Sequence, residues 1–150
     1  MNRLDNKDYE KSNKLETVAL SRFDKHYMAK VMKSETLKDR QVNSQLLLDY
    51  LCDKFGIPHC KLTVTDATRP QTKTKRGTCT EYGHYVTHKY DIVIYNTTPA
   101  RKQVVAIKTF VDTLIHEFIH HYDMTYLHFS ASPHTCGFYK RISDLKAKLM

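Results

Sequence analysis

Two histidines and a glutamate, His116, Glu117 and His120, stand at a spacing that suits a metal ion. In a helix, residues four apart lie about 40° from each other around the axis and about 6 Å along it. Two neutral imidazoles at this separation can supply two corners of a tetrahedral zinc site, while the glutamate projects beside the metal without binding it. The HExxH pattern therefore predicts a zinc centre with the two histidines as ligands and Glu117 as general base.

A catalytic zinc site also needs a third ligand and an open position for water, whose pKa the metal lowers to about 7. One known extension of the pattern would place glycine at 123 and histidine at 126, but the chain has Asp123 and Tyr126 there. A downstream glutamate is excluded as well, because none follows Glu117. The remaining candidates for the third ligand are His121, His128, His134, Asp123, Asp144 and Cys136.

Helix geometry separates some of these candidates. His121 points about 120° away from the centre of the HExxH pair, and His128 lies about two turns beyond it, so surface or packing roles suit both. Asp123 shares the face of the pair one turn later, where it suits the support of a ligand histidine. His134 follows the segment SASP, a turn that ends the helix and can bring the chain back.

The segment HEFIH, followed after a gap by HTCGFYKRI, resembles the SprT-like (Spartan-type) zinc metallopeptidases, in which a third histidine stands in an H-x-x-x-F context. Here that histidine is His134 and the phenylalanine is Phe138. The resemblance covers mainly residues 60–145 and implies a small α+β zincin-like domain that hydrolyses peptide bonds in protein or peptide substrates. The Zn²⁺ ligands that it implies are His116, His120 and His134, with Glu117 as the catalytic residue.

The elements around the motif are predicted from the spacing of apolar residues and from residues that typically begin or end helices and turns. Apolar residues within 15–31 recur at helical spacing and predict a first helix, and a second helix follows Ser34 and ends at Gly56. Residues 62–65 alternate as in a short strand, and residues 78–95 predict a hairpin that ends in DIVIY.

A cap residue and a proline, Thr98 and Pro99, then predict the start of the motif helix, because proline at the first helical position loses no hydrogen bond. This helix is expected over residues 99–126, with Val104 at the start of its core face. A last helix is expected to run through Tyr139, Ile142 and Leu145.

Length and composition predict one soluble domain over residues 1–150, with a helical N-terminal part (1–58) and a part that carries the sheet and the zinc site (60–150). Hydrophobic residues make up 41% and charged residues 27%, which disfavours a disordered chain. No stretch reaches a membrane-spanning length and the start lacks an apolar signal core, so a cytoplasmic location is expected. The four cysteines form no CxxC pair, so a zinc ribbon is not indicated.

The net charge of +8 favours contact with polyanions. The densest basic stretch, RPQTKTKR, makes Arg69, Lys73, Lys75 and Arg76 candidate DNA contacts, although a solvated loop would look the same. DNA-linked members of the resembled family act on proteins held on DNA, which makes DNA a candidate partner. The alternative from a different class is a catalytically idle, zinc-stabilised nucleic-acid-binding module, in which Cys136 would close the metal site as a fourth ligand.

Overall fold

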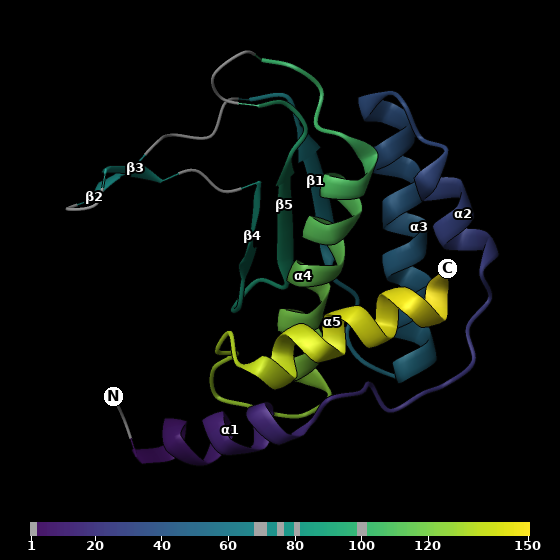
Figure 1. The fold of residues 1–150 in the computed structure, drawn as a ribbon. Coiled ribbons are helices and arrows are strands. Elements are labelled where there is room, and N and C mark those ends of the chain that lie inside the picture. Colours follow the sequence, from purple (N-terminus) through teal and green to yellow (C-terminus); the bar gives the residue numbers. More distant parts are fainter. Residues whose placement is uncertain (1–2, 68–71, 75–76, 80–81, 99–101) are drawn as a thin grey trace.

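The chain has an α+β fold, as expected, in the computed structural model, which describes residues 3–67, 72–74, 77–79, 82–98 and 102–150 (Figure 1). The helices are α1 (Arg3–Lys14), α2 (His26–Met32), α3 (Leu37–Phe55), α4 (Ile107–Thr125) and α5 (Cys136–Leu149). The strands are β1 (Lys61–Thr65), β2 (Thr72–Thr74), β3 (Gly77–Cys79), β4 (Gly83–Val86) and β5 (Asp91–Tyr95).

A sheet of three strands, in the order β1-β5-β4, has helices α3 and α4 packed against it. The predicted strand at 62–65 is β1, which pairs in parallel with β5, and the predicted hairpin contains the antiparallel pair β4 and β5. Alternate residues such as Leu62, Val64 and Ile92 are buried while their neighbours are more exposed, as expected of strands with one covered face. Strand β4 is an edge strand of this sheet.

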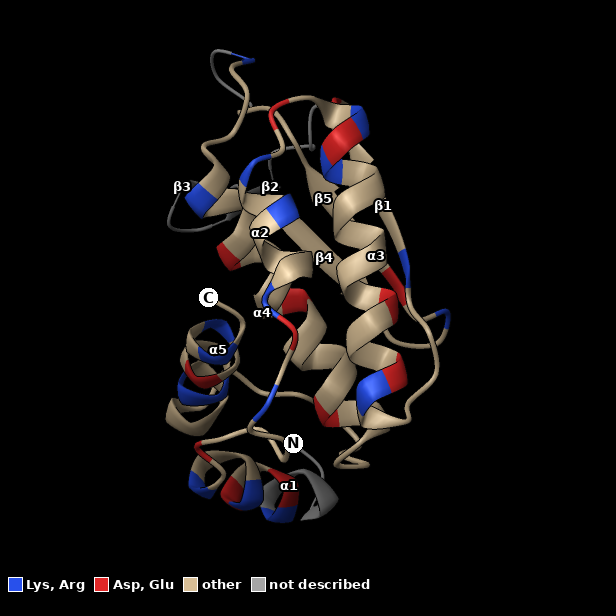
Figure 2. Ribbon diagram, turned by 90° about the vertical axis from the view of Figure 1, so that its right-hand side faces the viewer, with Lys and Arg blue, Asp and Glu red and all other residues tan. Residues whose placement is uncertain are grey.

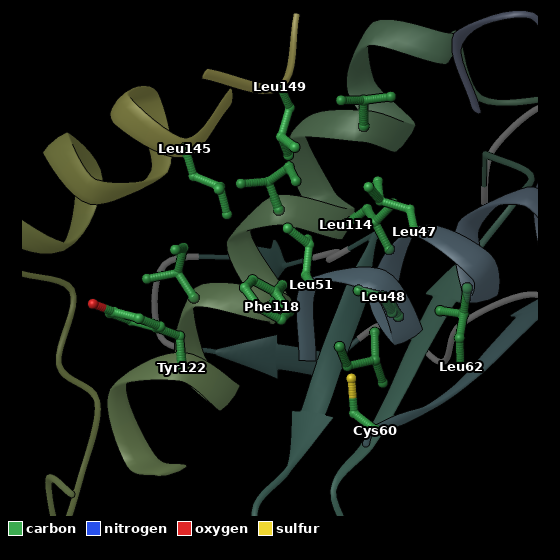
Figure 3. Close-up of a cluster of buried hydrophobic side chains, with 14 of the residues drawn as sticks. Leu47, Leu48, Leu51, Cys60, Leu62, Leu114, Phe118, Tyr122, Leu145 and Leu149 are labelled. Atoms are coloured by element: carbon green, nitrogen blue, oxygen red, sulfur yellow. The ribbon is translucent and has the colours of Figure 1, made fainter. Parts of the chain in front are cut away.

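The core lies between this sheet and the helices α3, α4 and α5. Figure 3 shows Leu47 and Leu51 of α3, Leu114 and Phe118 of α4, and Leu145 of α5 pointing toward one another. The predicted second helix is confirmed as α3, which ends where Gly56 adopts a φ of +69°, the left-handed conformation that glycine reaches without strain. No helix in the described part of the chain is both long and apolar enough to cross a membrane.

The prediction of a helix over residues 15–31 is wrong in its first half. Residues 15–25 run without helix between α1 and α2, and only His26–Met32 is helical. Here the backbone N–H groups of Val18 and Ala19 donate to the Asp144 carboxylate and to the Tyr122 hydroxyl. Side chains of α4 and α5 therefore replace the helical hydrogen bonds, a tertiary effect that local periodicity does not report.

The motif helix also begins later than expected, at Ile107 instead of residue 99. Thr98 closes a turn, since its hydroxyl accepts from the Gln103 N–H and its carbonyl from the Lys102 N–H. A bridge between Thr97 and Val104 precedes the helix, and Val104 is 56% exposed instead of lying on the core face. Thr98 therefore belongs to a turn that precedes the helix, whereas Pro99 lies outside the described residues.

The basic stretch falls largely outside the described residues. Lys73 lies in β2, which pairs with β3, whereas Arg69, Lys75 and Arg76 lie where the structure is not described. On the helices of the face in Figure 2, Lys and Arg alternate with Asp and Glu along α1, α3 and α5. The prediction of a DNA contact at this stretch stays a prediction.

Candidate metal centre

Three histidines, two from α4 and one from the segment before α5, meet at one point. His116 and His120 lie one turn apart on α4, and His134 stands two residues before α5. One ring nitrogen from each lies within 4.8 Å of the other two. The ring centroids are separated by 5.0 Å (His116–His120), 4.9 Å (His116–His134) and 5.0 Å (His120–His134). Of the candidates for a third ligand, His134 is the one that the fold brings to the HExxH pair.

The spacing of the ring nitrogens fits a tetrahedral metal site. The Nε2 atoms of His120 and His134 are 3.1 Å apart. Two nitrogens that each bind zinc at about 2.0–2.1 Å in a tetrahedral arrangement are separated by about 3.3 Å. Burial first, and then the nearby His116 and His134 rings, lower the pKa of His120 to about 3. His120 is therefore neutral near pH 7, which is the form that binds metal.

Hydrogen bonds select the tautomer of His120 that can bind a metal ion. The Ser132 hydroxyl lies 2.8 Å from His120 Nδ1 and donates its own proton to Asp123 Oδ2, also at 2.8 Å. Because that proton is already donated, Ser132 Oγ accepts from His120, whose Nδ1 must carry the hydrogen. The lone pair of His120 then lies on Nε2, which faces His134. Asp123 thus orients His120 through Ser132, and its predicted support of a ligand histidine stays a prediction.

Asp123 is in turn held by Arg141 of α5. The guanidinium donates to both carboxylate oxygens, at 3.1 Å and 2.8 Å, and both side chains are fully buried. Its remaining N–H groups donate to the Ser12 carbonyl and hydroxyl and to the Leu15 carbonyl. The end of α1 therefore satisfies the buried arginine, and Figure 1 shows α1 and α5 lying side by side.

The same end of α1 reaches the start of α5. Ser12 Oγ is 2.9 Å from Oγ1 of Thr135, which caps α5 by accepting from the Phe138 N–H. A Cβ at Gly137 would lie 2.0 Å from the Ser12 carbonyl oxygen, so only glycine permits this approach. The residues that follow His134 are thereby held against the end of α1.

Phe138 explains the spacing of the H-x-x-x-F motif. Its buried ring is stacked on His120 with centroids 4.6 Å apart, and its centroid lies 5.0 Å from that of His116 in a T-shaped arrangement and 5.1 Å from that of the tilted His134 ring. Phe138, four residues after His134, packs against all three imidazoles and so limits their rotation. Fixed rings lose less entropy when they bind a common ion.

The three histidines and Glu117 line a cleft of about 710 Å³. Its other walls are β4 with Tyr82 and Gly83, and the 130–132 segment. A Cβ at Gly83 would lie 2.8 Å from Thr113 Cγ2, so glycine lets β4 approach α4 closely. Glu117 lies at the wall of this cleft with only 6% of its surface exposed.

The remaining candidates for a third ligand have other contacts. His121 is fully buried and bonded to Tyr85 and Pro58, and His128 is exposed. Asp144 accepts from the Val18 N–H and pairs with Lys148. Cys136 is exposed, and its sulfur is not part of the three-histidine group found in the described chain.

Three residues that support the site were not identified from the sequence: Ser12, Ser132 and Arg141. Ser12 belongs to a segment that gave no signal of proximity, and Ser132 belongs to the SASP turn, which was expected to return the chain without a role for the serine. Arg141 did carry a signal, because it lies on the buried side of α5 together with Phe138 and Leu145. An arginine among core positions indicates a buried acidic or carbonyl partner.

The hydrogen bond to His120 leads to a first prediction, in which Ser132→Ala leaves Nδ1 without its acceptor. We expect metal affinity to fall by about 10- to 100-fold, the usual effect of losing a group that orients a ligand histidine. Competition with a chromophoric chelator measures this affinity. Ser143→Ala, at an exposed position of α5, is the matched control and should bind metal like the parent protein. An unchanged affinity in Ser132→Ala would show that the serine does not orient His120.

The arrangement therefore comprises three imidazoles with supporting contacts, a carboxylate beside them and an adjoining cleft, which together could hold a metal ion and move a proton. Comparisons of the chain with protein-family models, with curated proteins and with solved structures found no significant match.

Proposed function

We propose that this chain is a zinc-dependent endopeptidase of the SprT-like type, with His116, His120 and His134 as metal ligands and Glu117 as the catalytic base. One observation carries the proposal: the three ligand histidines converge beside a carboxylate at the wall of an open cleft. A site that served stability alone would be closed by a fourth protein ligand. Cys136, the thiol considered for that role, is exposed and outside the histidine group.

The donor set suits zinc. Neutral imidazoles are ligands that zinc prefers, and hydrogen bonding and burial hold His120 in its neutral, Nε2-available form. When bound, zinc would supply Lewis-acid chemistry, polarising a carbonyl oxygen and making water acidic near neutral pH.

The chain's own residues have distinct roles in this proposal. Glu117 takes a proton from the attacking water and passes it to the amine that leaves, as a general base and then a general acid. Its low exposure places the carboxylate in a medium where proton transfer is little disturbed by bulk water. Ser132, Asp123 and Arg141 act at a distance by keeping the His120 ring in one orientation.

An extended peptide suits the shape of the cleft. Strand β4, which lines one wall, pairs with β5 on one side and is an edge of the three-stranded sheet. An edge strand offers backbone N–H and C=O groups to an added strand. A peptide paired there would run along the wall of the cleft that holds Glu117, so the class of substrate we propose is an unfolded or flexible protein segment.

Proteins held on DNA are a narrower proposal for the substrate. It rests on the resemblance and on the net charge of +8, because three of the four basic residues invoked lie outside the described part of the structure. Binding through a basic loop should weaken steeply as salt concentration rises, since each neutralised phosphate releases counterions. A cytoplasmic location is part of the same proposal.

The proposal is tested by zinc dependence of cleavage. Metal-free protein is incubated with a denatured, fluorescently labelled protein, with and without added zinc. We expect cleavage to require zinc, to stop on addition of a chelator and to return when zinc is restored, because three histidines alone cannot activate water. Cleavage that continues in excess chelator would exclude a metal mechanism. Zinc-loaded protein that cleaves no denatured substrate would favour the nucleic-acid-binding alternative.

A further inference from the structure

A second group of metal-binding side chains lies on another side of α4 from the three histidines. Cys52 is in the last turn of α3, Cys60 immediately precedes β1, and His121 follows the ligand His120. One ligand atom from each of the three residues lies within 4.8 Å of the other two. All three side chains are buried, with 0%, 2% and 0% of their surfaces exposed. Figure 3 shows the Cys60 sulfur pointing into the core.

The His121 ring is oriented as in a metal-binding histidine. Its Nε2 lies 2.7 Å from the Pro58 carbonyl oxygen, which can only accept, so Nε2 carries the hydrogen. The lone pair is then on Nδ1, where the Tyr85 hydroxyl stands 2.8 Å away. Histidines that bind metal usually donate their other N–H to a carbonyl or carboxylate, as this ring does.

The charges of the cluster balance when it holds a divalent cation. The contact between the two thiols lowers the pKa of Cys52 and, together with burial, raises the pKa of Cys60, so Cys60 holds its proton tightly when no ion is bound. Burial raises the pKa of Tyr85, and negative charge on Cys60, Tyr90 or Cys52 raises it further. A lone thiolate in this apolar core would be an uncompensated charge, whereas two thiolates, one neutral imidazole and a divalent ion sum to zero.

We propose that Cys52, Cys60 and His121 bind one zinc ion in a structural site, with the Tyr85 hydroxyl at the fourth position. Each thiol gives its proton to solvent as the ion binds, and the Tyr85 hydroxyl no longer donates to His121 Nδ1. The ion would join the end of α3, the start of β1 and α4 at the residue after His120. It would thus fix the helix that carries the HExxH motif, and this assignment does not depend on peptidase activity.

Cobalt(II) distinguishes the two sites, because thiolate ligands give a sulfur-to-cobalt charge-transfer absorption and imidazole ligands alone do not. Metal-free, reduced protein is titrated with cobalt. We expect each chain to bind two equivalents of cobalt, of which one gives the charge-transfer absorption. It should be lost in Cys52→Ser and in Cys60→Ser. It should persist in His116→Ala, which removes a ligand of the other site, and in Cys136→Ser, the control for the exposed thiol.

Zinc analysis gives an independent count: two ions per wild-type chain, and one in Cys52→Ser if circular dichroism shows that this variant is folded. The wild-type titration does not depend on any variant folding. Reduced wild-type protein that binds cobalt without charge-transfer absorption would overturn the proposal. It would equally be overturned if the absorption disappeared only in Cys136→Ser, or if the two thiols formed a disulfide with peroxide but bound no metal when reduced.

Discussion

Replacing Glu117 by glutamine is expected to leave the metal content unchanged and to reduce peptide cleavage by about 10²- to 10⁴-fold, the usual contribution of a general base. The amide has nearly the same shape as the carboxylate but cannot take the proton from water. The three histidines and the contacts that orient them are untouched. The rate of cleavage of a denatured protein at saturating zinc, together with zinc analysis of the same samples, measures both effects.

The matched control for this variant is Glu16→Gln, which makes the same chemical change at a surface residue paired with Lys140. It should cleave like the parent protein. Two results would contradict the assigned role of Glu117. Cleavage at the parental rate would mean that another group acts as the base, and loss of zinc would mean that the carboxylate is itself a ligand.

Arg141→Met is expected to lower the free energy of unfolding by about 3–5 kcal/mol, the range typical of breaking a buried ion pair by removing one partner. The Asp123 carboxylate would remain buried with only Ser132 to satisfy it. The carbonyls of Ser12 and Leu15 would also lose their donor, so the end of α1 should detach from α5. Chemical denaturation of the metal-free protein measures the loss without the contribution of bound zinc.

A double variant separates the ion pair from other effects of the substitution. Adding Asp123→Leu to Arg141→Met removes the isolated charge, so the double variant should be less destabilised than the sum of the two single changes. Arg141→Met alone should also weaken metal binding, because Asp123 then holds Ser132 and His120 less firmly. A loss below about 1 kcal/mol would mean that the pair is not buried in solution.

The sequence predicted helix α3 because its signals are local. Apolar residues recur at helical spacing after Ser34 and Gly56 ends the helix, although Thr36, which caps it, was not identified. The segment 15–25 has helical periodicity as well, but its backbone bonds to Asp144 and Tyr122, residues more than 100 positions away. A short stretch of sequence does not reveal hydrogen bonds to such distant residues.

The candidate site divides in the same way. His116 and His120 follow from helix geometry alone, because four residues make about one turn. His134 needed a resemblance to a known motif, since its approach depends on how α5 packs on α4. Ser132, which bridges the His120 and Asp123 side chains, and Arg141, which donates to the end of α1, were not predicted. Both act through contacts between segments that are apart in the sequence.

Anomalous diffraction at the zinc edge, from crystals grown with zinc, tests the central claim most directly. We predict a peak about 2.0–2.1 Å from one nitrogen of each of His116, His120 and His134, with its fourth position open to the cleft that Glu117 lines. A peak whose fourth ligand is a protein side chain such as Cys136 would contradict a catalytic centre. The absence of any peak at these three histidines would contradict the metal site itself.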